Sequence, residues 1–192
     1  MDAVFSLGWA GQHASYFNSA NMSARQNFAK ASEDAINEQI NAELFASYQY
    51  RAMVAYFDRD EVALLGFRDF FKHSAEEEAE HAQIFIDYQN KRGGRVVLKA
   101  VEAPKQEWAS ALEALEDALA LEKTVNGKLL ALHAVADAAN DPQMTDFLEG
   151  TFLEEQVEAI KDLANKVTNL KRVGEGLGLY MFDKDMAASV SK

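Results

Sequence analysis

The sequence predicts an all-α protein: a four-helix bundle with one long crossover and a short fifth helix at its C-terminal end. Apolar residues recur at alternating steps of four and three along four long segments, which is the period of one helix face. Both prolines, Pro104 and Pro142, fall between these segments, and strand-like alternation is almost absent. The first and third connections are short, so each joins antiparallel neighbours, whereas the second is long enough to run the length of a bundle.

The first two helices are delimited by breaks in the apolar pattern. The first is expected over residues 32–57, with Ser32 as its start. Residues 58–60 break this helix, and Asp60 is expected to cap the second. Lysine and arginine at 91 and 92 suit a helix C-terminus, and the glycines at 93 and 94 stop the helix there.

The second half of the chain begins with the long crossover, expected over residues 95–105. Trp108 is expected to open the third helix. Asp141 then caps the fourth helix and Pro142 takes its first position, because proline lacks the N–H that this position leaves unpaired. The fourth helix is expected to end near residue 173. A glycine-rich turn and a short apolar helix over about 179–187 follow.

Polar residues interrupt the apolar stripe of each helix, where a buried charge is costly unless something pairs with it. Considered singly, each has an ordinary explanation: a glutamate at the stripe's edge that reaches water, a core histidine, or an amide that fixes helix register. Together they are hard to place in one core without cations. The residues are Glu43, the Glu-x-x-His pair Glu78 and His81, Glu122 and, more weakly, Gln156.

This set of side chains predicts a metal centre. A donor set rich in carboxylates and poor in imidazoles suits iron or manganese, and the chain has no cysteine for a zinc-thiolate site. Di-iron bundles place a glutamate on some helices and Glu-x-x-His on others, all pointing inward. A second Glu-x-x-His is missing, and the fourth helix offers Glu155 and Gln156 at the matching depth. We therefore expect two unequal metal positions.

Composition and charge limit the other functions. The 192 residues carry a net charge of −12, which opposes nucleic-acid binding and favours cations. No apolar stretch approaches the length of a membrane span, so we expect no membrane partner. Residues 1–24 contain no lysine or arginine and lack the pattern of a secretory signal. We interpret them as a surface extension, rather than a processed targeting remnant, ahead of one domain over 25–192.

Eight runs of residues resemble eukaryotic ferritins, in family order and with similar spacing, over about residues 25–184. They are INEQINAELFASYQYRAM (36–53), FDRDEVAL (57–64), EEEAEHA (76–82), QNKRGGR (89–95), LEKTVN (121–126), NDPQM (140–144), EEQVEAIK (154–161) and FDK (182–184). The resemblance is to heavy-chain-type subunits, which are the catalytically active ones. It implies the ferritin-like fold with a cage of 24 subunits, and a cytoplasmic protein, with a plastid or another organelle as the alternative.

The resemblance also implies a ferroxidase: two Fe²⁺ ions per subunit are oxidised by dioxygen, and a ferric oxyhydroxide mineral is stored in the cage. Glu77 and Glu80 correspond to the patch that nucleates mineral, and Asp146 and Glu149 to the entry pores. Glu77 and Glu80 are followed by Gln83, where relatives often have glutamate. The ferroxidase centre corresponds to Glu43, Tyr50, Glu78, His81, Glu122 and Gln156.

Three alternatives stay open at the level of sequence. A storage or structural cage without catalysis would show no saturable fast oxidation phase. A monomeric or dimeric di-iron oxidase would usually carry the second Glu-x-x-His and form a small particle. A mini-ferritin that protects DNA would lack the C-terminal helix and place its ligands across a subunit interface. The size of the particle separates the last two from a ferritin cage.

Overall fold

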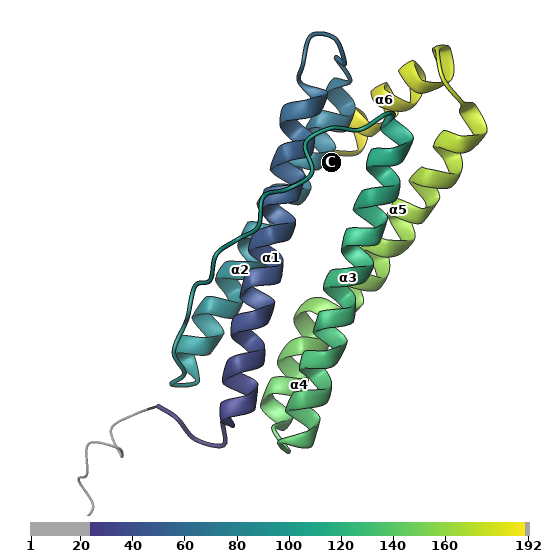
Figure 1. Cartoon of the computed structure of the whole chain (residues 1–192). Coiled ribbons are helices and arrows are strands. Elements are labelled where there is room, and N and C mark those ends of the chain that lie inside the picture. The colour runs from purple at the N-terminus through teal and green to yellow at the C-terminus, as the bar shows by residue number, and fades with distance from the viewer. Residues whose placement is uncertain (1–23, 191–192) are drawn as a thin grey trace, which may run out of the picture.

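The computed structural model describes residues 24–190, and the described chain is all-α, as predicted. Four rods lie side by side, and the fourth rod is built from three consecutive helical segments (Figure 1). The sixth helix lies across one end of the bundle and packs mainly on α2. The elements are α1 (Lys30–Phe57), α2 (Leu65–Lys91), α3 (Ala111–Ala138), α4 (Pro142–Leu148), η2 (Glu149–Leu153), α5 (Glu154–Val173) and α6 (Leu177–Val190).

Three helices besides α2 start at other residues than the sequence predicts. The first helix begins at Lys30, two residues before Ser32. The third begins at Ala111 rather than at Trp108, because the Ser110 side chain accepts a hydrogen bond from the N–H of Glu113, and the Glu113 carboxylate accepts one from the N–H of Ala109. The C-terminal helix is longer than residues 179–187 at both ends. The predicted cap at Asp141 is confirmed, with Pro142 in the first turn.

The prediction that Asp60 caps the second helix is wrong. Asp60 lies in the turn, and α2 begins five residues later. The cap comes from α6: Oδ1 of Asp183 accepts hydrogen bonds from the backbone N–H groups of Gly66 (2.7 Å) and Phe67 (3.2 Å). A Cβ atom on Gly66 would lie 1.8 Å from the Asp183 carbonyl oxygen, so glycine permits this close approach. The carboxylate also suits the positive end of the α2 dipole.

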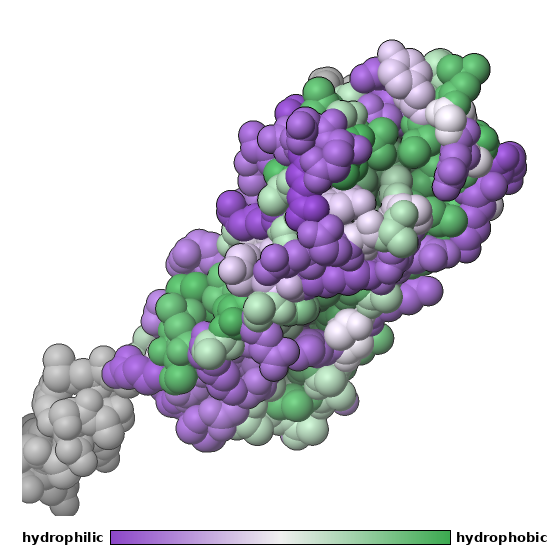
Figure 2. Space-filling view, turned by 45° about the horizontal axis from the view of Figure 1, so that its top comes forward, coloured by the Kyte–Doolittle hydropathy of each residue, from purple (hydrophilic) through white to green (hydrophobic). Residues whose placement is uncertain are grey.

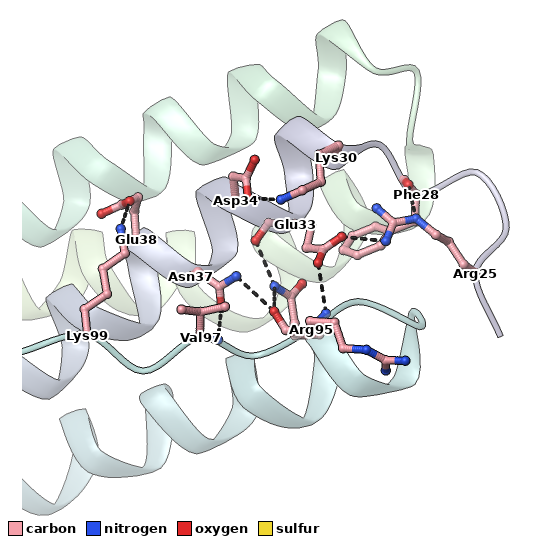
Figure 3. A network of polar contacts seen from close by, with 11 residues as sticks. Arg25, Phe28, Lys30, Glu33, Asp34, Asn37, Glu38, Arg95, Val97 and Lys99 are labelled. Atoms are coloured by element: carbon pink, nitrogen blue, oxygen red, sulfur yellow. Dashed lines mark hydrogen bonds and ion pairs between the residues drawn. The ribbon is translucent and has the colours of Figure 1, made fainter. Parts of the chain in front are cut away.

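Side-chain amides of α1 hydrogen-bond to the backbone of the long crossover. Asn37 donates to the carbonyl of Arg95 (3.0 Å) and accepts from the N–H of Val97 (2.9 Å), as Figure 3 shows. Farther along α1, Gln49 makes the same two-way contact with the backbone of Lys105. Because the crossover does not pair with a strand, these amides provide hydrogen-bond partners for its backbone N–H and C=O groups.

The fourth rod contains a π-helical turn, which the apolar pattern of the sequence does not predict. Met144, Leu148, Phe152 and Gln156 are all buried and recur at steps of four. In a regular α-helix each such step turns about 40° past a full circle, so the row would leave the core. A π turn has more residues per turn and absorbs this drift. It thereby keeps Gln156 facing the bundle interior.

The hydrophobic core forms two clusters. One surrounds Phe57, Phe67 and Phe71 near α6, and the other surrounds Phe85 and Phe152, whose rings stack at 4.3 Å. The polar residues that interrupt the stripes of α2, α3 and α5 fall between the two clusters, and Glu43 of α1 lies next to the same boundary. No helix among the described residues is long and apolar enough to cross a membrane.

Candidate metal centre

A buried polar layer joins the four rods at the boundary between the two clusters. Glu43 is fully buried on α1, Glu78 lies on α2, Glu122 on α3 and Gln156 on α5. Glu78 and His81 are three residues apart, so they project together from α2. The helix periodicity that makes the apolar stripes also turns these polar side chains toward the bundle interior.

Glu43, Glu78 and His81 form the tightest part of this layer. Each offers one ligand atom, and the three atoms lie within 4.8 Å of one another. Oε2 of Glu43 and Oε2 of Glu78 are buried and make no hydrogen bond. Nδ1 of His81 lies 3.4 Å from Oε2 of Glu78. Two buried oxygens without a donor, beside an imidazole nitrogen, fit a hard divalent or trivalent cation.

Glu122 is arranged differently, because both of its oxygens accept hydrogen bonds. The Tyr50 hydroxyl donates to Oε1, and Nε2 of Gln156 donates to Oε2 at 2.5 Å. Nε2 of Gln156 also donates to the Glu122 carbonyl at 3.1 Å. The structure thus brings all six residues predicted for the centre together, in two unequal halves. Their role as metal ligands stays a prediction.

The electrostatics of the layer favour a bound cation. Burial, and then repulsion from Glu78, raise the pKa of Glu43 well above 4.5. Burial, and then repulsion from Glu122, raise the pKa of Glu78 in the same way. Burial and the nearby Glu122 charge raise the pKa of Tyr50, so this phenol keeps its proton. A cation would relieve the repulsion that these carboxylates feel when ionised.

A cavity of about 420 Å³ connects this layer to the groove between α2 and α5. The backbones of α2 and α5 approach each other less closely than do those of the pairs α1–α2, α1–α3 and α3–α5. Oε1 of Glu155 lies 3.3 Å from Nε2 of His81, and Oε1 of Glu77 lies 3.2 Å from Nε2 of His73. Burial also raises the pKa of Glu77. Among the lining residues described, Lys166 is the lone lysine or arginine, and it pairs with Asp162.

The remaining predicted site residues lie apart from one another. Glu77 lines the cavity, whereas Glu80 is exposed and does not line it. Asp146 and Glu149 are exposed on α4 and η2, and Glu149 pairs with His133 at 2.7 Å. One subunit contains no pore, so the role of these two carboxylates stays a prediction.

Sequence reasoning missed two polar residues near the centre. Gln39 is buried and donates to Glu43, but it lies outside the stripe that contains Glu43. Its spacing of four residues from Glu43 is a signal that could have found it. His73 lines the cavity one turn before Glu77, and the same spacing would have identified it. Neither spacing is informative until Glu43 and Glu77 are already suspected.

Comparison with known proteins identifies relatives across most of the chain. Residues 33–173 match the family model described as "Ferritin-like domain". The chain is 57% identical over 169 residues to "Soma ferritin" of Lymnaea stagnalis, covering 88% of this chain and 97% of that one. It is 57% identical over 162 residues to "Ferritin heavy chain" of Echinococcus granulosus (84% and 94%) and over 166 residues to "Ferritin, chloroplastic" of Malus baccata var. xiaojinensis (84% and 66%).

Proposed function

Since the chain belongs to the ferritin family and is an iron-storage subunit, we propose that it is also a ferroxidase. Its substrates are Fe²⁺ and dioxygen, and two iron ions react in each subunit. The observation that carries the proposal is the pair of buried, unbonded oxygens on Glu43 and Glu78 beside His81. A storage subunit without catalysis has no need to bury uncompensated carboxylates in its core.

The residues divide between two iron positions. Glu43 and His81 hold the first ion, Glu78 bridges, and Glu122 holds the second with Gln156 beside it. The second ion has to displace hydrogen bonds that Tyr50 and Gln156 make to Glu122, so we expect it to bind more weakly than the first. Carboxylates bind Fe³⁺ better than Fe²⁺, which favours the oxidised product.

The reaction balances with two irons and one dioxygen. Each Fe²⁺ gives up one electron, and dioxygen accepts the two electrons and two protons to form hydrogen peroxide. The groove carboxylates Glu77 and Glu155 lie next to the centre and offer Fe³⁺ a path out of the bundle. The ferric product then hydrolyses and is stored as mineral, with nucleation assigned to Glu77 and Glu80.

The cage belongs to the same proposal. Twenty-four copies would enclose the mineral, with Asp146 and Glu149 lining the pores through which Fe²⁺ is drawn by negative charge. Exposed apolar residues on α6 support assembly, since Leu177 is 75% and Met181 58% exposed in the single subunit. We propose a cytoplasmic location, with a plastid or another organelle as the alternative.

Rapid mixing of the metal-free protein with Fe²⁺ in air tests the ferroxidase proposal. We expect a fast phase of ferric absorbance that saturates at two Fe²⁺ per subunit. Glu43→Ala combined with His81→Ala should abolish this phase, whereas Glu76→Ala, which alters an exposed carboxylate outside the cavity, should keep it. A parent protein without the fast phase would be a non-catalytic storage subunit. A double variant as fast as its parent would show that the site assignment is wrong.

A further inference from the structure

We propose that Gln39 is a positioning residue for the metal centre, because its amide orients the Glu43 carboxylate and leaves Oε2 to bind the cation. Gln39 lies one helical turn before Glu43 on α1, so the two side chains are neighbours on the helix surface. Its Nε2 donates a hydrogen bond to Oε1 of Glu43 at 2.7 Å. The inference rests on the proposed function of this centre and concerns a residue that is not itself a ligand.

The burial of Gln39 calls for a partner, since a buried amide is costly without one. Gln39 is only 1% exposed. The other buried amides of α1, Asn37 and Gln49, bond to the backbone of the crossover. Within residues 24–190, the one hydrogen bond of the Gln39 side chain is to Glu43. The amide therefore serves this carboxylate rather than the crossover.

The contact fixes which oxygen of Glu43 is free. With Oε1 engaged by the amide, rotation of the carboxylate would break the hydrogen bond, and Oε2 stays buried without a donor. Gln156 makes the corresponding contact on the other side of the centre, where its amide donates to Oε2 of Glu122. Each of the two terminal carboxylates is thus held by a buried glutamine. Such supporting partners determine how well ligands are oriented for a metal.

Titration of the metal-free protein with Co²⁺ measures the effect without iron oxidation. Gln39→Leu keeps the size of the side chain and removes the donor. We expect about 10- to 100-fold weaker binding of the first Co²⁺. The visible Co²⁺ absorption bands should also shift, because a freely rotating Glu43 changes the ligand geometry. Gln39→Met, which is unbranched and flexible, repeats the test with a smaller change in packing.

Gln49→Leu is the matched control, since it removes a buried glutamine amide from the same helix. It should lower thermal stability and leave Co²⁺ affinity and absorption unchanged. In a Glu43→Ala background, Gln39→Leu should have no further effect on Co²⁺ binding, because the residue it acts through is gone.

The outcomes separate the inference from the proposed function. Parent-like Co²⁺ affinity and absorption in both Gln39 variants would overturn the inference and leave the metal centre standing. An undiminished effect of Gln39→Leu in the Glu43→Ala background would also overturn it. If the Glu43→Ala variant binds Co²⁺ as well as the parent does, the centre itself is overturned, and the role of Gln39 with it.

Discussion

Glu122 and Glu43 are both buried carboxylates of the polar layer, but their hydrogen bonds prepare them for different tasks. Glu122 has a donor on each oxygen, from Tyr50 and Gln156, and is fixed before any cation arrives. Glu43 has one donor, from Gln39, and one bare oxygen. The half of the centre that contains Glu43 therefore gains more from a cation, and we expect it to fill first.

Tyr50→Phe removes the hydroxyl that holds Glu122 and keeps the ring that packs on Phe71. Glu122 then loses one of its two donors, which costs about 1 kcal/mol of folding free energy. The second metal position should bind Co²⁺ more tightly, because the ion no longer has to displace this hydrogen bond, while the first position is unchanged. Stepwise Co²⁺ titration and thermal unfolding measure the two effects. Weaker binding at the second position, or an equal change at both, would contradict this assignment of Tyr50.

Glu43→Gln should stabilise the metal-free protein at neutral pH. The pKa of Glu43 is raised above 4.5 by burial and by Glu78, so the folded chain keeps this proton at pH values where the unfolded chain has lost it. In that window the folded state binds more protons, and the free energy of unfolding falls as pH rises. Glutamine has no such proton, so the variant should unfold at a higher temperature than the parent.

The advantage of Glu43→Gln should shrink as the pH falls through 4.5, the ordinary pKa of a glutamate, because below it the unfolded parent also holds the proton. Thermal unfolding in a chelating buffer at several pH values checks this. Glu38→Gln, an exposed carboxylate on the same helix, is the control and should show little change. A stability difference that does not vary with pH would mean that packing, and not the charge of Glu43, is responsible.

At the scale of the helices, the sequence predicts features that depend on residues within one turn, but not those that depend on contacts between distant parts of the chain. The Asp141 cap and the polar breaks at Glu78 and Glu122 were predictable, because each shows within one turn of its own helix. The cap on α2 was not, because Asp183 reaches Gly66 across 117 positions of the chain. Gln39 was not predicted for another reason, because helix period alone does not distinguish it from a solvated polar residue.

Asp183→Ala tests the link between α6 and α2. The substitution leaves the first N–H groups of α2 without their acceptor, and loss of such a cap costs about 1 kcal/mol. It also releases α6, whose Phe182 packs against Phe67. We expect faster amide hydrogen exchange in α6 and the first turn of α2. Asp185→Ala, an exposed carboxylate two residues away, should leave exchange unchanged. Unchanged exchange in Asp183→Ala would show that packing alone holds α6.

At the scale of the whole molecule, the end of the bundle that carries α6 exposes apolar side chains in the single subunit. Figure 2 turns this end toward the viewer and shows apolar side chains among hydrophilic ones. Leu177, Tyr180 and Met181 are all more than half exposed here, although α6 is anchored by Asp183 and the buried Met186. A helix held in place with its apolar residues outward is suited to contact further subunits.

Leu177→Glu combined with Met181→Glu tests whether this end is an assembly surface. Both side chains are exposed, so the subunit should fold, but charges at a subunit contact should prevent closure of the cage. Light scattering should give about 24 subunit masses for the parent and a small particle for the variant. The proposed metal centre lies within one bundle, so the variant should still oxidise Fe²⁺ rapidly. Its ferric product should precipitate, because no shell encloses it. A variant that stays large and retains soluble iron would place the assembly surface elsewhere.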